Sequence, residues 1–321
     1  MKQDKLLREN ESSCALYSAQ ELTCCGKNSS SRSKFLSKAE IKEKAAQIFF
    51  LAAACISILA VALICIFLFA NGLPAMKEIG ITDFLFGKKW KPGIGVYGIF
   101  PMILGSIYVT AGAIITGVPA GLLTAVFLVK FCPKKLYKIL KPTIDLMAGI
   151  PSVVYGFWGM VVLVPFVRDV FGGNGSSILT ASILLGIMIL PTIISVCESS
   201  IRAVPQSYYE GALALGATKE QSTFFVVLPA AKSGITAGII LGVGRAIGET
   251  MAVIMVAGNQ ARMPNGILKG IRTLTANIVI EMGYAVDLHR EALIATGVVL
   301  FIFIMIINLL FSVMKSKRNT Q

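Results

Sequence analysis

The sequence predicts an all-α membrane protein with about six transmembrane helices, on three observations. Hydrophobic residues make up 55% of the 321 residues, charged residues make up only 15%, and several long runs carry almost no charge. A transmembrane helix needs about 20 apolar residues, whereas apolar runs of about 10–14 are typical of buried helices in soluble proteins. Six runs exceed the shorter length, and only one of them contains charged residues, Arg245 and Glu249. The runs are 45–70, 92–129, 146–167, 170–197, about 235–257 and 292–314.

The first run follows a polar tail, residues 1–44, which is rich in Ser, Lys and Glu. That composition is typical of a mobile segment. The tail has no short apolar core followed by a small-residue cleavage site, so we expect the first helix to be an uncleaved insertion signal. We expect 45–98 to hold the first helix and an external loop, 99–314 a unit of five helices, and 315–321 a cytoplasmic C-terminus.

The distribution of Lys and Arg predicts the orientation. With the N-terminus placed in the cytoplasm, 20 of the 30 Lys and Arg residues fall on the inner side and nine on the outer side. The positive-inside rule therefore places both termini in the cytoplasm of a multi-pass protein of the cell membrane, as an even number of helices requires. The net charge of +13 follows mostly from this asymmetry and does not indicate nucleic-acid binding.

The seven cysteines and the single histidine predict no metal centre. No cysteine falls in an expected external loop, so a disulfide framework is not predicted. The adjacent pair Cys24-Cys25 matches no zinc-binding spacing. His289 has no partner histidine, and we expect it to be solvated in an external loop.

The longest polar stretch inside the five-helix unit, Glu198–Lys232, is expected to lie in the cytoplasm. It predicts two short helices outside the bilayer. Gly216 is well placed to end the first helix in a left-handed conformation. Thr218 and Gln221 have the spacing of a capping box for the second helix, which we expect Pro229 to end.

This stretch contains a motif with a defined spacing. It reads Glu210-Gly211-Ala212, three residues, Gly216, nine residues, then Val226-Val227-Leu228-Pro229. The motif resembles the cytoplasmic coupling motif of permeases of ATP-binding cassette (ABC) importers, with Gly211 and Val226 as mild departures. The resemblance implies the ABC importer permease (MetI-like) fold, with cytoplasmic coupling helices that dock on a separate ATPase. The coupling residues that it implies are Glu210, Gly211, Ala212, Gly216, Leu228 and Pro229.

Three further segments resemble the signatures of phosphate-specific transport permeases: Gly242–Val253, Asp145–Gly156, and the run Arg202-Ala203-Val204-Pro205 that leads into Tyr209-Glu210. The first resembles the PstC type more than its paralogue PstA, and both belong to the binding-protein-dependent transport system inner-membrane component family. The resemblance spans about 45–314 and leaves the tail without a functional account. It implies three partners besides the lipid bilayer: a second, PstA-like permease, a PstB-like ATP-binding dimer and an external PstS-like phosphate-binding protein.

Arg245 and Glu249 are four residues apart, so on a continuous helix they share a face with Gly238 and Gly242. A charge at the centre of a bilayer costs about 2.5–3.5 kcal/mol on insertion scales, which usually marks a functional role. We expect Arg245 to offer a counter-charge to phosphate and Glu249 to hold Arg245 when the pathway is empty. The alternative is an internal ion pair that only fixes helix packing.

The segment Gly149-Ile150-Pro151-Ser152 is expected to break the third helix near its cytoplasmic side, since Pro151 removes a backbone donor. Ser152 could then donate a hydrogen bond to an anion in the pathway. A simple kink that neighbouring helices satisfy is the alternative. Asp145 follows Lys141 by four residues, and we expect these two to pair.

Nothing in the sequence predicts an enzyme or a bound cofactor. It contains no Gly-x4-Gly-Lys-Ser/Thr phosphate-binding sequence and no nucleophile with a nearby base. ATP hydrolysis is therefore expected on a partner chain. Two alternatives stay open: a permease of the same architecture for another oxyanion, such as molybdate or sulfate, and an ATP-independent secondary transporter. A secondary transporter would show internal repeats, which we do not detect.

Overall fold

The computed structural model describes residues 43, 44 and 46–318, and the side chains as far as Leu310. The expected tail, apart from its last residues, and Cys24 and Cys25 lie outside this range. The chain divides into two units, residues 1–66 and residues 67–321. The described part of the first unit belongs to a single helix, Ala46–Ile79, which runs on into the second unit. This helix extends nine residues beyond the end of the apolar run that predicts it.

The number of membrane-spanning helices agrees with the prediction. Among the described residues, five helices are long and apolar enough to cross a membrane, and the number is six when two helices that meet at a bend of 73° are counted as one span. The five are Ala46–Ile79, Phe100–Phe131, Ser152–Phe171, Ile178–Arg202 and Asp287–Leu310, and the bent pair is Lys219–Ala230 with Lys232–Gly248.

The core of the second unit is built around α7 (Ile178–Arg202), which packs against α3 (Phe100–Val126) and α11 (Lys232–Gly248). Glycines bring these helices close together, as the glycine spacing in α11 predicts. A Cβ atom added at Gly242 would lie 2.8 Å from Ile193 Cγ1, and one added at Gly117 would lie 2.8 Å from the Gly186 carbonyl oxygen. The face of α11 that carries Gly244 is different, because a Cβ added there meets nothing within 4 Å.

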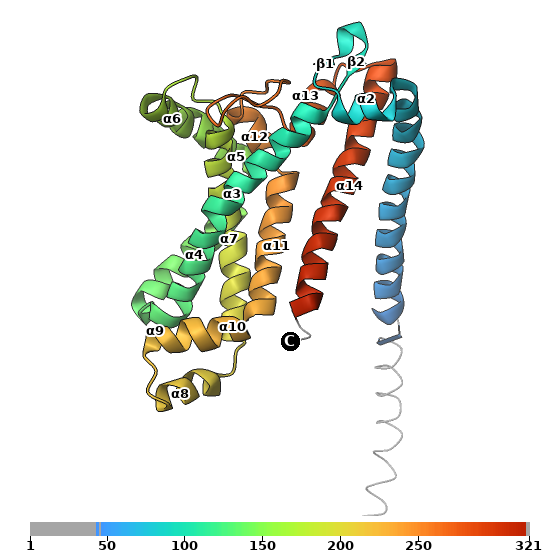
Figure 1. Ribbon diagram of the computed structural model, residues 1–321. Coiled ribbons are helices and arrows are strands. Elements are labelled where there is room, and N and C mark those ends of the chain that lie inside the picture. Colours follow the sequence, from blue (N-terminus) through green and yellow to red (C-terminus); the bar gives the residue numbers. More distant parts are fainter. Residues whose placement is uncertain (1–42, 45, 319–321) are drawn as a thin grey trace, which may run out of the picture. The chain divides into compact units, whose positions relative to one another are not determined.

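The elements of the second unit gather at two ends, which Figure 1 shows. At one end, here called the α8 end, lie α8 (Gln206–Ala214), α9 (Lys219–Gln221) and α10 (Leu228–Ala230). At the other, the hairpin end, lie α2 (Ile81–Phe86), α13 (Leu274–Glu281) and a small hairpin. α14 (Asp287–Arg318) runs from the hairpin end to the α8 end.

The hairpin is an exception to the all-α prediction. Its strands are β1 (Trp90–Lys91) and β2 (Val96–Tyr97), with Trp90 opposite Tyr97. A 3-10 turn (Pro92–Ile94) joins the strands, and Gly95 follows it with φ +72°, a conformation that glycine adopts readily. The expected break at Pro92, Gly93 and Gly95 is therefore this tight turn.

The predicted run 146–167 does not form one helix. The amphipathic helix α4 (Lys134–Gly149) ends before Pro151, and the span begins afresh at Ser152. It continues through α5 (Ser152–Trp158), a π-helical turn (Gly159–Leu163) and α6 (Val164–Phe171). The break at Pro151 is as predicted, but it separates α4 from the span and does not divide the span itself.

The predicted run 235–257 is also interrupted. Helix α11 ends at Gly248, Glu249 has an extended conformation, and α12 (Met251–Val256) starts two residues later. The assumption of a continuous helix through Arg245 and Glu249 is therefore wrong. α12 packs against α5, where a Cβ on Gly156 would lie 2.9 Å from the Ala252 Cα atom.

Candidate coupling and translocation sites

The motif-bearing segment forms two short helices, as predicted, although it begins later than predicted. Helix α7 continues to Arg202, so Glu198 belongs to its last turn and not to the loop. Helix α8 ends in a Schellman motif: the amide of Gly216 donates to the Leu213 carbonyl at 2.9 Å, and the amide of Ala217 donates to the Ala212 carbonyl at 3.1 Å. Gly216 has φ +85°, which confirms the predicted left-handed conformation.

The second helix begins with the predicted capping box. The Gln221 amide donates to Thr218 Oγ1 at 3.2 Å, and the Thr218 amide donates to Gln221 Oε1 at 2.9 Å. The helix continues through a π-helical stretch (Ser222–Val227) into α10. Pro229 lies inside α10, and the 73° bend into α11 comes after Ala230. The expectation that Pro229 ends the helix is therefore wrong by one residue.

The six predicted coupling residues divide by exposure. Glu210, Gly211, Gly216 and Pro229 are exposed, whereas Ala212 and Leu228 are half-buried. A Cβ added at Gly211 or Gly216 meets nothing within 4 Å, so another chain can approach the backbone at these two positions.

The same region exposes large apolar side chains that are not among the six predicted coupling residues. Leu215 is 91% exposed, Phe225 is 77% exposed and Tyr208 is 53% exposed. Leu215 interrupts a run of small residues next to Gly216, which was the available signal in the sequence. An exposed apolar group of this kind, at the end of a helix bundle, is typical of a surface that another protein covers.

Helix α8 is fixed to the core by its other face. Tyr209 and Val204 pack against the main hydrophobic core. The Lys130 ammonium lies 4.3 Å from the centroid of the Tyr209 ring, a cation–π contact with the π-helical end of the α3 span (Phe127–Phe131). These contacts attach α8 to the core and to the end of the α3 span.

Arg245 and Glu249 do not form the predicted pair, because the helix ends between them. Arg245 is half-buried, and its Nη1 donates to Thr192 Oγ1 on α7 at 3.4 Å. Glu249 Oε1 instead accepts from the Ala252 amide at 3.1 Å, which caps α12, and the Glu249 carbonyl accepts from Thr275. Among the described residues, no ion pair joins Arg245 and Glu249.

Ser152 is the first residue of α5 and is half-buried. The described side chains form no hydrogen bond or ion pair that links Ser152 with Arg245 or Glu249. The structure therefore does not bring the three predicted pathway residues together: Ser152 starts α5, Arg245 lies on a face of α11, and Glu249 caps α12.

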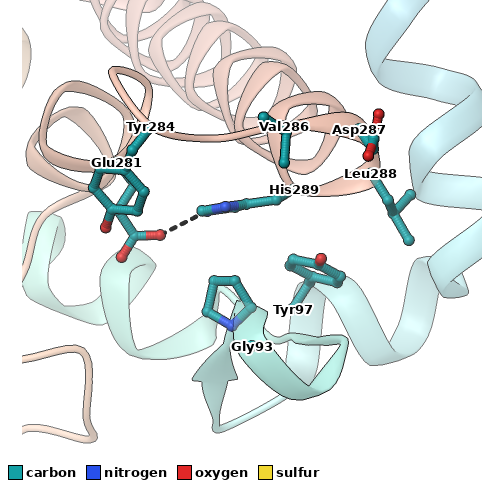
Figure 2. A pocket seen from close by; sticks show the side chains of 9 residues that line it. Gly93, Tyr97, Glu281, Tyr284, Val286, Asp287, Leu288 and His289 are labelled. Carbon is teal, nitrogen blue, oxygen red and sulfur yellow. Dashed lines mark hydrogen bonds and ion pairs between the residues drawn. The ribbon is translucent and has the colours of Figure 1, made fainter.

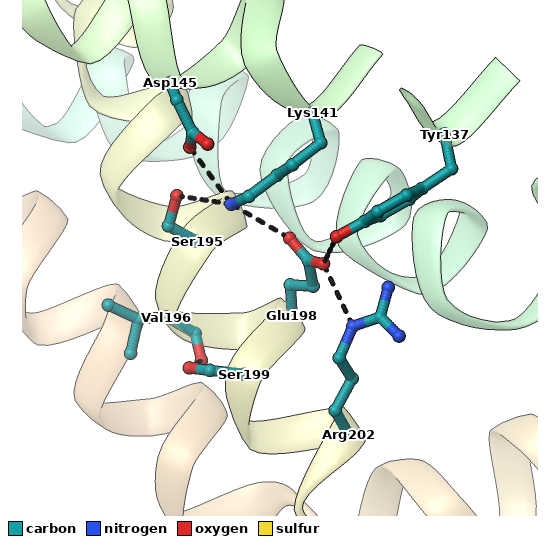
Figure 3. Close-up of polar contacts among 8 residues, drawn as sticks. All are labelled: Tyr137, Lys141, Asp145, Ser195, Val196, Glu198, Ser199 and Arg202. Atoms are coloured by element: carbon teal, nitrogen blue, oxygen red, sulfur yellow. Dashed lines mark hydrogen bonds and ion pairs between the residues drawn. The ribbon is translucent and has the colours of Figure 1, made fainter. Parts of the chain in front are cut away.

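A polar cluster around the buried carboxylate of Glu198, at the α8 end, was only partly predicted (Figure 3). The pair of Lys141 and Asp145 is confirmed, with Nζ 3.0 Å from Oδ1. Lys141 also lies 3.1 Å from Oε2 of Glu198, whose side chain is only 5% exposed. Glu198 Oε1 accepts from Tyr137 Oη at 2.7 Å and from Arg202 Nε at 3.0 Å. These five residues, called here the Glu198 cluster, join α4 to the last turns of α7.

A second buried carboxylate, Glu281, organises the hairpin end (Figure 2). Its Oε2 accepts from Trp90 Nε1 at 2.8 Å and lies 2.9 Å from His289 Nε2, while Oε1 pairs with Arg272. The His289 side chain is 13% exposed, so its expected solvation is wrong. Burial raises the pKa of Glu281, but hydrogen bonds from Trp90, His289 and Arg272 outweigh burial and hold the pKa below 4.5.

A pocket of about 480 Å³ opens beside Glu281, lined by Tyr97, Tyr284, Asp287 and His289 among others. The described residues contain no group of three or more His, Cys, Asp or Glu placed to hold a metal ion.

The fold, a bundle of membrane-spanning helices with a capped helical pair at one end, is shared with chains of solved ABC transporters. A chain in the crystal structure of a bacterial alginate ABC transporter gives a TM-score of 0.59 at 17% identity, over 85% of this chain and 96% of that one. A chain of the inward-facing MetNI methionine ABC transporter gives a TM-score of 0.55 at 20% identity, over 71% of this chain and 99% of that one. At these identities the likeness concerns the fold alone.

The family follows from closer matches. The family model described as "Binding-protein-dependent transport system inner membrane component" matches residues 117–318, and this chain belongs to that family. The probable ABC transporter permease protein YqgH of Bacillus subtilis is 38% identical over 84% of this chain and 89% of its own length. The phosphate transport system permease protein PstC of Mesorhizobium japonicum is 35% identical over 76% of this chain and 81% of its own. The chain is thus a multi-pass transport subunit of a membrane rather than an enzyme.

Proposed function

We propose that this chain is the permease subunit of an ATP-driven phosphate importer. The observation that carries the proposal is its similarity to phosphate permeases of distant organisms. Besides the Mesorhizobium protein, the probable phosphate permease PstC of Methanocaldococcus jannaschii is 34% identical over 76% of the chain and 84% of its own length. Neither of the alternative functions gains support from these relatives.

Three partners follow from the proposed function: a second, PstA-like permease, a PstB-like ATP-binding dimer at the α8 end, and a PstS-like phosphate-binding protein at the hairpin end. The exposed surface of α8 supports the second assignment. Gly211 and Gly216 leave room for a groove of the ATPase to approach, and Leu215 and Tyr208 give it apolar side chains to bury. The rest of the docking element is assigned by resemblance to the coupling motif: Glu210, Ala212, Leu228 and Pro229.

Transport then proceeds by alternating access. Closure of the ATPase dimer moves α8, and α8 moves the helices to which Tyr209 and the 73° bend connect it. Rigid-body motion of packed helices, rather than deformation within them, opens the pathway to the cytoplasm. This places the α8 end and both termini in the cytoplasm.

Arg245 is the residue of this chain that we assign to the phosphate pathway. Its guanidinium has only a long contact to Thr192 and no carboxylate partner among the described residues, so it can bind an anion without first breaking an ion pair. Ser152 is assigned to the same pathway as a hydroxyl donor. Glu249 acts through the backbone: by capping α12 it positions the chain just beyond Arg245.

Uptake of labelled phosphate tests the proposal in cells that lack or carry this chain, with and without the ATPase subunit. We expect uptake to require both chains. Uptake that needs no ATPase would indicate a secondary transporter, and unchanged phosphate uptake after deletion would indicate another substrate. Purification of the tagged chain from detergent extract should also recover an ATP-binding subunit and a second permease.

Arg245→Gln tests the pathway assignment within the same assay. Because it removes a charged donor to the anion, we expect uptake to fall at least about tenfold while the complex still assembles. Arg245→Lys keeps the charge but lacks the planar set of donors of the guanidinium. We expect its uptake to lie between that of the unaltered chain and that of Arg245→Gln. Full transport by either variant would contradict the role.

A further inference from the structure

We propose that the Glu198 cluster is a latch between α4 and α7 that opens and closes once in each transport cycle. The proposal rests on the proposed function in one respect only, that the complex is driven by ATP. Glu198 is a positioning residue in it, because it acts on the helices and not on the substrate.

The first argument is energetic. A buried ion pair seldom stabilises a protein more than apolar side chains of the same shape, because the charges lose their hydration. Glu198 nevertheless lies in the interface of α4 and α7 with its side chain 5% exposed. Such a pair is best explained as a contact that specifies one of two arrangements of α4 against α7, because an apolar contact would allow several arrangements.

The second argument is the pairing pattern. Lys141 and Asp145 are an i, i+4 pair on α4, and Glu198 and Arg202 are an i, i+4 pair on α7. Among the described side chains, the polar contacts that cross between the helices are Lys141–Glu198 at 3.1 Å, Tyr137–Glu198 at 2.7 Å, Lys141 Nζ to Ser195 Oγ at 3.4 Å, and the Arg202 guanidinium over the Tyr137 ring. When α4 leaves α7, each helix therefore keeps a neutral pair of its own, and no charge is left without a partner.

The exposure of the four charged groups fits this motion. The Asp145 side chain is 52% exposed and that of Arg202 is 47% exposed, so both already contact solvent at the edge of the cluster. Each can stay paired with the charged residue on its own helix as the contact between the helices opens, because neither has to pass through a water-free region. An ion pair that only locks packing has no need of a second partner for each charge.

The latch lies between α8, where we propose that the ATPase docks, and Ser152 at the start of α5, which we assign to the phosphate pathway. Arg202 is the last residue of α7, four residues before α8 begins, and its guanidinium carbon lies 4.9 Å from the centroid of the Tyr137 ring. Helix α4 leads through the break at Pro151 directly into Ser152. Movement at α8 can thus reach the start of α5 when the contacts between α4 and α7 are released.

The test is a distance between the two helices in the assembled complex. Spin-labelled noncanonical residues at the exposed positions Ile139 on α4 and Ser199 on α7 leave the native cysteines in place. Pulsed electron paramagnetic resonance should give different distances in the nucleotide-free complex and in the complex trapped with a non-hydrolysable ATP analogue. One of the two should match the closed latch of this structure.

The double variant Asp145→Asn with Arg202→Gln removes the second partners but keeps the Lys141–Glu198 contact. Opening now leaves both charges unpaired, so we expect the closed distance in both nucleotide states and phosphate import at least about fivefold slower. Arg168→Gln with Asp169→Asn is the matched control, because it makes the same changes in an exposed pair outside the cluster. The control should behave as the unaltered chain.

Two results would overturn the latch: an unchanged distance in a complex that hydrolyses ATP and imports phosphate, or normal opening and import by the double variant. If the double variant does not assemble, the distance in the unaltered complex decides alone. A complex whose distance responds to ATP but which imports no phosphate would contradict the proposed substrate and leave the latch standing.

Discussion

At the scale of single residues, the structure separates side chains that share a type but not a role. Glu210 is exposed on α8, Glu249 caps α12, and Glu198 and Glu281 are buried at opposite ends of the second unit. The sequence assigns Glu210 to the coupling motif and Glu249 to the pathway, but it does not show that Glu198 and Glu281 are buried. The difference comes from contacts between distant segments, such as the 191 positions that separate Trp90 from Glu281. Periodicity cannot report contacts of that kind.

Gly216→Ala should weaken coupling because alanine in the left-handed region costs about 1–2 kcal/mol. The end of α8 should fray, and we expect less ATPase in the purified complex together with slower phosphate uptake. Gly211→Ala is the matched control, since its added methyl also meets nothing within 4 Å but the residue is helical. Equal behaviour of the two variants would show that the conformation at Gly216 is unimportant.

Glu281 predicts a loss of stability in acid. Its pKa is lowered on folding, so its contribution is fully present above about pH 4.5 and is lost as the pH falls through the lower folded value. The groups that face it are Trp90, Arg272, His289 and, at the pocket, Tyr284.

We therefore expect the thermal midpoint of the detergent-purified chain to fall as the pH is lowered below about 4.5. Glu281→Gln should lower the thermal midpoint at pH 7, because the lost contacts reduce the free energy of unfolding by about 2 kcal/mol. It should also make the midpoint less sensitive to acid. Glu291→Gln, at an exposed position on α14, serves as the control. An unchanged acid response in the Glu281 variant would exclude this carboxylate as its source.

At the scale of elements, apolar runs predicted where the spans lie but not where they break. The end of α11 had two signals that the run of apolar residues concealed: Gly248, a residue that often ends helices, and Thr250, which stands at the start of α12. The same applies to α4, which shares an apolar segment with the span after it and separates from it only at Pro151. The capped helices of the coupling segment were predictable, because caps depend on neighbours in sequence. The Glu198 cluster was not, because α4 and α7 meet only in the folded chain.

The contact between α3 and α7 should not tolerate a single added methyl group. In Gly117→Ala the new Cβ would lie 2.8 Å from the backbone oxygen of Gly186, so the helices must separate, at a cost of about 1–3 kcal/mol. Gly244→Ala adds the same methyl inside α11 where nothing lies within 4 Å, and it should be neutral or stabilising. Thermal unfolding of the two purified variants compares them, and an unaffected Gly117→Ala chain would refute the close contact.

At the scale of the whole molecule, the distribution of Lys and Arg predicts which end faces the cytoplasm. Ser207 on α8 and Lys89 before the hairpin are both exposed, at the α8 end and the hairpin end respectively. A cysteine at position 207 should react with a membrane-impermeant thiol reagent only in inside-out vesicles, and one at position 89 only in right-side-out vesicles. Labelling is measured above that of the parent chain, which has its own cysteines. The opposite labelling pattern would show that the α8 end faces away from the cytoplasm, and it would contradict docking of the ATPase on α8.

The interruption between α11 and α12 has a consequence for solvent access. Helix α11 has 17 residues and is about 26 Å long, which is less than the roughly 30 Å of a hydrocarbon core. Its last turn, the extended Glu249 and the start of α12 therefore sit at membrane depth without a continuous helical ladder of hydrogen bonds. Lipid does not tolerate such backbone, so it must adjoin protein or water. Deuterium should accordingly enter the amides around Thr250 far sooner than those in the middle of α7, as an island of rapid isotope exchange deep within an otherwise slowly exchanging bundle.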